Sequence, residues 1–181
     1  MTALQTTKVT DGWVGPDGVL MAPASAEILE AAGLKAFFGY WLARSAGRIG
    51  PKRADIDLRD MAGLLPHLHF YDVVDGGRSF YVRVVGTAIV ASVGSDHTKL
   101  TLTDADQDLP ARRAIAIMRA AIAQKAGIRT TSSRIAAMKP SVQAVESLWL
   151  PLSEDGTTVS QILACSMTNV PAAIFSSSPG S

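Results

Sequence analysis

The stretch HLHFYDVVDGGRSFYVRVVG, residues 67–86, decides the fold of this 181-residue chain. Apolar and polar side chains alternate through its two halves, residues 67–74 and 79–86, and such alternation is typical of β-strands. Asp75-Gly76-Gly77-Arg78 separates the halves, and the two glycines suit a tight turn. The stretch therefore predicts an antiparallel hairpin.

A loop at the two glycines sets the register of this hairpin. It pairs Asp72 with Tyr81, Phe70 with Arg83 and Leu68 with Val85. These six side chains then share one face of the hairpin. The opposite face carries His67, His69, Tyr71, Val73, Phe80, Val82 and Val84.

Asp72 and Arg83 carry the charges on the first face. Their diagonal positions bring the two side chains within reach of each other, so we expect a structural ion pair. In the alternative interpretation, Arg83 keeps its planar guanidinium for a carboxylate or phosphate ligand.

Helical segments flank the hairpin. A leading helix is predicted over 25–47, where apolar residues recur at helical spacing and Ser25 is suited to cap the first turn. A second long helix is predicted over 109–125, and shorter helical pieces over 57–65 and 87–93.

An aromatic group broadens the apolar side of the leading helix. It consists of Phe37, Phe38, Tyr40 and Trp41. Such a stripe is typical of a helix that packs on the core. The alternative, compatible with the first, is that part of the stripe faces a second copy of the chain and forms a homodimer.

Three further strands are predicted over 128–137, 142–152 and 157–169. With the hairpin they make a five-stranded antiparallel sheet in an α+β chain. Residues 1–24 are rich in turn signals and predict an N-terminal arm. Residues 25–170 form the domain, and 171–181 a flexible tail.

Composition excludes several classes of function. Hydrophobic residues make up 48% and charged residues 18%, which is typical of a globular domain. The single cysteine, Cys165, excludes an intramolecular disulfide and a thiolate zinc cluster. The net charge of +1 indicates no particular partner. No secretory signal or membrane span is evident, so we expect a cytoplasmic protein.

Catalytic motifs are missing from the sequence. It contains no Gly-x-Ser-x-Gly elbow, no phosphate-binding Gly-x-x-x-x-Gly-Lys loop and no His-Glu-x-x-His pair. We therefore expect a protein that is not an enzyme.

Five segments, in order along residues 27–170, resemble a known family. The first consists of Leu34, Tyr40-Trp41, Arg44 and PKRADID (51–57). The other four are LPHLHFYDV (65–73), YVRVVGT (81–87), GSD (94–96) and ESLWLPLSEDG (146–156). Together they resemble the PAS domain family, in particular small stand-alone bacterial PAS proteins with a leading helix. The resemblance implies a five-stranded antiparallel sheet flanked by helices, and a sensory or protein-interaction role without catalysis.

The resemblance also implies a pocket between the sheet and the helices at 87–125. Its candidate ligand-binding residues are Phe70, Arg83, Val85, Met118 and Trp149, although the sequence leaves open which face Trp149 occupies. The pocket holds a small ligand or is filled by side chains. In the second case the protein is an adaptor that acts only by contact with a partner, which the sequence does not identify.

A metal, a haem or a flavin would each need particular residues in or near this pocket. His67 and His69 share a strand face at a spacing that chelates metals, but no third ligand, such as Asp96 or His97, is shown to converge on them. We expect no metal. A haem would use His97 as its axial ligand. A flavin-cysteinyl photosensor needs a cysteine in the helical region, whereas Cys165 lies on the last strand. The sequence favours neither cofactor.

The segment 112–139 is basic and contains no acidic residue. Its charged residues are Arg112, Arg113, Arg119, Lys125, Arg129, Arg134 and Lys139. A solvated basic face is the simpler interpretation. The alternative is a surface for an anionic partner, either nucleic acid or lipid, and nucleic acid is not favoured.

Overall fold

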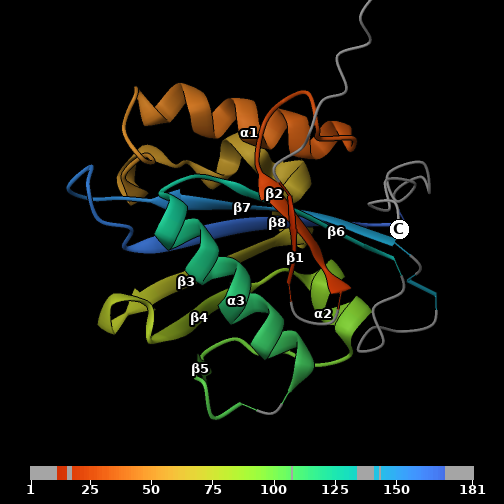
Figure 1. Ribbon diagram of the computed structural model, residues 1–181. Coiled ribbons are helices and arrows are strands. Elements are labelled where there is room, and N and C mark those ends of the chain that lie inside the picture. The colour runs from red at the N-terminus through yellow and green to blue at the C-terminus, as the bar shows by residue number, and fades with distance from the viewer. Residues whose placement is uncertain (1–11, 16–17, 107, 134–140, 143, 170–181) are drawn as a thin grey trace, which may run out of the picture.

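One antiparallel sheet forms the centre of the molecule (Figure 1). The computed structural model describes residues 12–15, 18–106, 108–133, 141–142 and 144–169. The strands are β1 (Trp13–Val14), β2 (Leu20–Pro23), β3 (Leu68–Val74), β4 (Ser79–Val85), β5 (Thr101–Leu102), β6 (Ile128–Ser133), β7 (Ala144–Leu152) and β8 (Gln161–Thr168). Their order across the sheet is β1-β2-β6-β7-β8-β3-β4-β5.

The predicted α+β class and antiparallel sheet are confirmed, but the sheet has more strands than predicted. The five predicted strands correspond to β3, β4, β6, β7 and β8, and these form its continuous middle. β5 extends one side by pairing with β4. β1 and β2 extend the other side, because β2 pairs with β6.

The described part of the predicted N-terminal arm is thus built into the sheet. Val19 and Met21 are buried in the core at the edge that β2 covers. Their spacing of two residues is the strand signal, but the glycines and prolines around them obscure it. Residues 1–11 and the predicted tail at 171–181 lie outside the described residues.

Helices cover both faces of the sheet (Figure 1). They are α1 (Ala32–Ser45), α2 (Thr87–Val93), α3 (Leu109–Gln124) and the 3-10 helices η2 (Arg53–Asp55), η3 (Leu58–His67) and η4 (Asp75–Gly77). α1 and η3 pack on one face, here called the outer face, around Leu148, Leu150 and Leu163. α3 packs on the opposite, inner face.

The leading helix begins later than predicted. Ala31 is its N-cap, with extended backbone angles and no side-chain cap of its own, so the predicted start at Ser25 is wrong. The backbone N–H groups of Glu30 and Ala31 donate instead to the carboxylate of Glu146 on β7. This contact from a distant strand fixes the chain in a non-helical conformation just before α1.

Most of the predicted aromatic stripe belongs to the core of the same chain. Phe37, Phe38 and Trp41 are buried against the outer face. Trp41 Nε1 donates to the carbonyl of Pro151 at 2.9 Å. Tyr40 is half-buried, and its hydroxyl contacts Asp57. The burial of the stripe therefore needs no second protomer.

The hairpin contains a β-bulge that the sequence did not predict. Asp72 pairs with Tyr81 as expected, but the register shifts between Phe70 and Tyr71. Phe70 then pairs with Val84, not with Arg83, and Val85 pairs with His69, not with Leu68. Because Arg83 is the extra residue of the bulge, the two valines that follow exchange faces.

Candidate functional site

A cavity of about 110 Å³ lies between the inner face of the sheet and helices α2 and α3. β3, β4, β6, β7 and β8 form its floor, and Ile89 of α2 and Ile117 of α3 form part of its roof. Val19, just before β2, closes one side. Ligand sites for drug-sized molecules measure roughly 300–1,000 Å³. The size thus favours a ligand smaller than a haem or a flavin.

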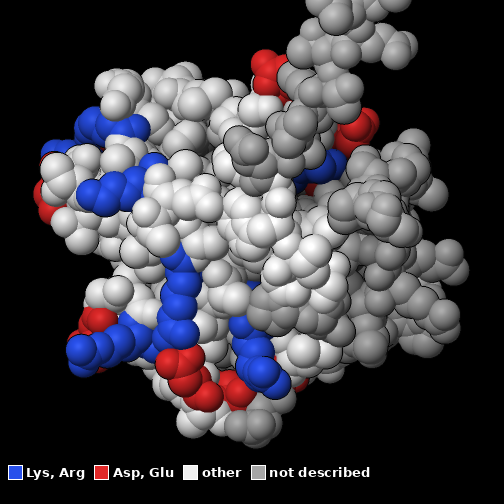
Figure 2. Space-filling model, in the orientation of Figure 1, with Lys and Arg blue, Asp and Glu red and all other residues white. Residues whose placement is uncertain are grey.

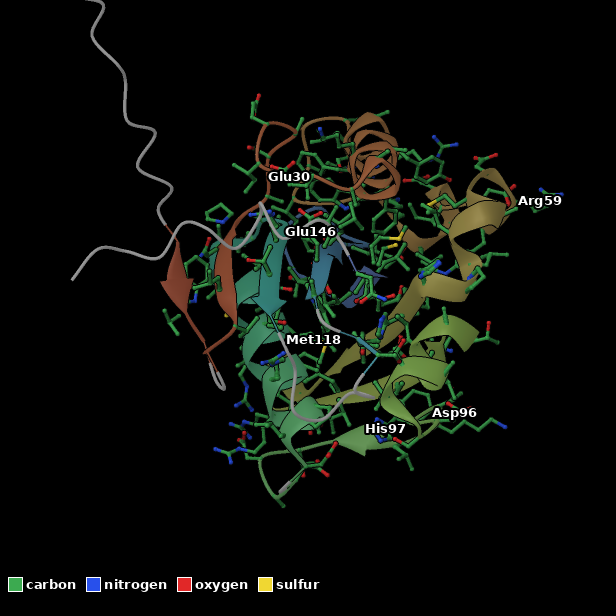
Figure 3. The ribbon with its side chains drawn as sticks, turned by 90° about the vertical axis from the view of Figure 1, so that its right-hand side faces the viewer. Glu30, Arg59, Asp96, His97, Met118 and Glu146 are labelled. Atoms are coloured by element: carbon green, nitrogen blue, oxygen red, sulfur yellow. The ribbon has the colours of Figure 1, made fainter. Side chains whose placement is uncertain are left out.

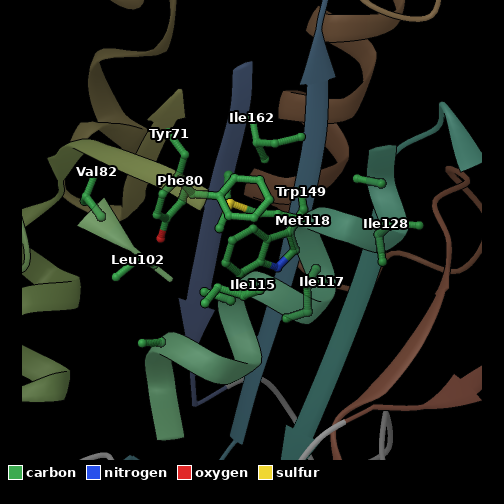
Figure 4. Close-up of a cluster of buried hydrophobic side chains, with 14 of the residues drawn as sticks. Tyr71, Phe80, Val82, Leu102, Ile115, Ile117, Met118, Ile128, Trp149 and Ile162 are labelled. Carbon is green, nitrogen blue, oxygen red and sulfur yellow. The ribbon is translucent and has the colours of Figure 1, made fainter. Parts of the chain in front are cut away.

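Three rings from β3 and β7 make the aromatic part of the floor. Figure 4 shows Tyr71 and Trp149 within the buried cluster beneath α3. The ring centroids of Tyr71 and Trp149 are 5.8 Å apart, and those of His69 and Trp149 are 6.0 Å apart. His69 Nδ1 lies 3.2 Å from the hydroxyl of Tyr71, which fixes the orientation of both rings.

Two buried ring nitrogens in this group have no hydrogen-bond partner among the described residues. They are Nε2 of His69 and Nε1 of Trp149. Burial lowers the pKa of His69 to about 4, so the imidazole is neutral near pH 7. Burial also raises the pKa of Tyr71, which keeps its phenol protonated.

A row of hydroxyl groups makes the polar part of the floor. Thr130, Ser147 and Ser166 are directly paired across β6, β7 and β8. Ser147 Oγ donates to Ser166 Oγ at 2.8 Å. All three side chains line the cavity and are buried. A cross-strand row of buried hydroxyls sets this floor apart from an ordinary apolar core.

Arg113 supplies positive charge to the cavity wall. It lies on α3, is 9% exposed, and its Nη1 donates to Ser132 Oγ at 3.3 Å. An arginine keeps its charge inside a protein. Among the described residues that line the cavity, none is Asp or Glu.

The structure divides the predicted ligand-binding residues between the two faces of the sheet. Val85 and Trp149 line the cavity. Met118 is fully buried in the core of the inner face (Figures 3 and 4) and does not line the cavity. Phe70 and Arg83 lie across the sheet, in a more open groove of about 540 Å³. The bulge explains this division, because it turns Val85 inward while Phe70 and Arg83 stay outside.

The predicted contact between Asp72 and Arg83 is present. Arg83 Nε lies 2.7 Å from the Asp72 carboxylate, and hydrogen bonding to that carboxylate raises the pKa of the guanidinium. Asp72 also accepts a hydrogen bond of 2.7 Å from Gln161 Nε2.

The histidines do not assemble a metal site. His69 lines the cavity floor, and His97 lines its mouth beyond α2, with Nε2 at 3.1 Å from Ser95 Oγ. Figure 3 shows His97 and Asp96 side by side in that turn. His67 ends η3 and does not belong to β3. In the part of the chain that the structure describes, no three His, Cys, Asp or Glu residues are grouped to hold a metal ion.

The basic segment does not form a uniform positive surface. Arg113 is buried, Arg119 bonds to Asp104 at 2.7 Å, and Arg129 bonds to the buried Glu146 at 2.8 Å. In Figure 2, blue side chains over the lower half alternate with red ones. Arg134 and Lys139 lie outside the described residues. The described residues thus favour neither a nucleic-acid nor a lipid surface.

Comparison with family models identifies the fold. A model of the PAS domain matches residues 29–167, which is most of the chain and extends from just before α1 to β8. The chain belongs to the PAS domain family. PAS domains are generally sensory modules without catalytic activity, and this is the role that membership suggests here. The site described above lies between the PAS sheet and the helices that cover its inner face.

Searches of curated proteins and of solved structures found no match. Within the described residues, no helix of this PAS protein has the length and apolar character needed to cross a membrane.

Several residues that line the cavity were not predicted as cavity residues from the sequence. Arg113 was assigned to a surface charge run, and the hydroxyl row was not recognised. A signal for the row did exist: Ser147 and Trp149 are two apart on a mostly apolar strand, so they share a face. Small polar residues on a strand buried on both faces indicate a polar cavity or a hydrogen-bonded core.

Proposed function

We propose that this PAS protein is a non-catalytic sensor that binds a small molecule in the cavity beneath α2 and α3. The observation that carries the proposal is the pair of buried nitrogens, Trp149 Nε1 and His69 Nε2, that line the cavity without a partner among the described residues. Leaving a buried polar group unsatisfied costs roughly 1–3 kcal/mol. A bound molecule with hydrogen-bonding groups removes that cost.

The runner-up function is an adaptor whose cavity stays closed and which acts only through protein contact. The small volume of the cavity favours it. The polar floor disfavours it, because a space that never holds a ligand is more stably filled with apolar side chains. We therefore place ligand binding first, with contact to a signalling partner as the output.

Native mass spectrometry of the freshly purified protein tests this proposal. We expect an added mass that disappears when the protein is denatured. Trp149→Phe removes the N–H that has no acceptor in the described part of the chain, and should lower the ligand-bound fraction. Trp41→Phe is the matched control, because the Trp41 N–H bonds to Pro151 on the outer face. A protein without added mass that also shows no thermal shift with small metabolites would favour the adaptor. The same spectrum tests the proposed homodimer.

A further inference from the structure

We infer that the groove on the outer face of the sheet is a second ligand site, which binds an aromatic anion. The groove has a volume of about 540 Å³ and lies over β3, β4 and β8, across the sheet from the cavity. Ligand sites typically measure roughly 300–1,000 Å³. The inference is independent of the proposed function, because no described residue lines both the groove and the cavity.

The floor of the groove is apolar and partly open to solvent. Phe70 of β3 is directly paired with Leu163 of β8, and Leu68 lies two residues before Phe70 on the same face. Leu65 of η3 and Val84 of β4 border this floor, and they are 41% and 49% exposed. Exposed apolar side chains gathered in a concave surface mark a site of ligand or partner binding. A ligand with an apolar body would remove them from water.

Planar groups in the groove favour an aromatic ring over a flexible chain. The guanidinium carbon of Arg53 lies 5.2 Å from the centre of the Phe70 ring. Tyr81 supplies a second ring to the lining. Flat ligands stack on rings and on guanidinium groups. A rigid ring also loses less conformational entropy on binding than a flexible chain does.

The charged groups of the groove favour an anion. They are Arg53, Arg83 and Lys99, and none of the described lining residues is Asp or Glu. Asp72 balances the charge of Arg83, but it accepts a hydrogen bond only from Nε. The two terminal amino groups of Arg83 therefore have no hydrogen-bond partner in the described ranges. Lys99 forms no ion pair with a described residue, and its backbone N–H donates to the Val82 carbonyl at 2.7 Å, which places it beside Arg83.

The same cations disfavour a second copy of the chain as the occupant. A two-fold axis at the groove would place this cationic patch on both sides of the interface. Like charges that face each other across an interface are unfavourable. A dimer that covered the groove would also leave no room for a ligand.

Fluorescence titration of the full-length protein with 8-anilinonaphthalene-1-sulfonate (ANS) tests the inference. ANS is an aromatic anion that emits strongly in an apolar site, and N-phenyl-1-naphthylamine has the same rings without the sulfonate. We expect saturable binding of ANS, weaker binding of the neutral probe, and displacement of ANS by naphthalene-1-acetate but not by naphthalene-1-methanol. The inference is wrong if ANS does not bind, or if the neutral probe binds equally well. Equal displacement by octanoate would overturn the aromatic class.

Variants assign the ANS signal to the groove. Arg83→Ala combined with Lys99→Gln should weaken ANS binding about tenfold and leave the neutral probe unaffected. Both side chains are exposed, so the variant should fold. Lys125→Gln is the matched control, because Lys125 is also an exposed lysine with a left-handed backbone conformation, at the end of α3. Trp149→Phe, in the cavity, should bind ANS like the parent protein. Unchanged affinity in the double variant, or an equal loss in Trp149→Phe, would overturn the inference.

Discussion

Glu146 of β7 and Arg129 of β6 form an ion pair behind the cavity floor, with Arg129 Nε 2.8 Å from Glu146 Oε1. The Glu146 side chain is completely buried. Its carboxylate also accepts the backbone N–H groups of Glu30 at 3.1 Å and Ala31 at 2.9 Å (Figure 3). A single side chain thus joins two strands of the sheet to the start of α1, where a negative charge is stabilised by the helix dipole.

Replacing Glu146 by Gln should destabilise the protein strongly. The substitution leaves Arg129 without its counter-charge. It also places an amide NH₂, which is itself a donor, beside the backbone N–H groups of Glu30 and Ala31. Breaking a buried ion pair from one side costs roughly 3–5 kcal/mol. We expect a loss of about this size in the free energy of unfolding, measured by urea denaturation.

The adjacent surface acid provides the control for this measurement. Glu30 is exposed, and only its backbone N–H contacts Glu146. Glu30→Gln should change the stability by less than about 0.5 kcal/mol. A similar small effect for Glu146→Gln would show that the pair does not hold α1 on the sheet.

The Asp72–Arg83 pair should behave differently, because it is open to solvent. The Arg83 side chain is 52% exposed and that of Asp72 is 20% exposed. Exposed pairs contribute roughly 0–1 kcal/mol and are screened by salt. Arg83→Ala should therefore cost less than about 1 kcal/mol, and the cost should shrink in high salt. Asp72→Ala should cost more, since Gln161 Nε2 then loses its acceptor. Equal and large costs for both variants would contradict this ranking.

Local patterns were enough to predict the main elements of the PAS fold. Alternation in residues 67–74 identified β3, and the helix predicted over 109–125 corresponds to α3, which the Asp108 side chain caps. The bulge at Arg83 could not be predicted in the same way. Val84 and Val85 are both apolar, so the sequence does not say which of them turns inward.

The cavity was harder to predict than the elements around it. Its charge comes from Arg113 on α3 and its neutral imidazole from His69 on β3. Its indole N–H, which has no acceptor among the described residues, comes from Trp149 on β7. These residues come together only through the strand order and the register of the whole sheet. Likewise, the carboxylate that accepts the backbone N–H groups just before α1 belongs to Glu146, which lies more than a hundred positions later in the chain.

Cys165 should be unreactive in the folded protein. It is fully buried, and burial raises the pKa of its thiol to about 12. Because the thiolate is the reactive form, a disulfide reagent such as DTNB should modify it at pH 8 only through unfolding. In concentrated guanidinium chloride the single thiol should react at once and completely. Rapid modification under native conditions would show that the outer face near β8 opens readily.

His69 should make stability fall as the pH is lowered from about 6.5 to 4. Burial lowers the pKa of His69 from 6.5 to about 4 in the folded protein, so the unfolded chain binds the proton more tightly. The stabilising contribution is complete above pH 6.5, declines through this window and is lost below pH 4. A difference of this size corresponds to roughly 3 kcal/mol.

This pH window separates His69 from the carboxylates. Hydrogen bonding to Arg59 lowers the pKa of Asp57 from 3.8 to about 2, so its contribution is lost only at lower pH. His69→Gln should therefore flatten the dependence of the unfolding free energy on pH between 6.5 and 4. His97→Gln is the matched control, because His97 lies at the cavity mouth and is only half-buried. It should keep the slope of the parent protein. The same slope in the His69 variant would mean that another group binds the proton.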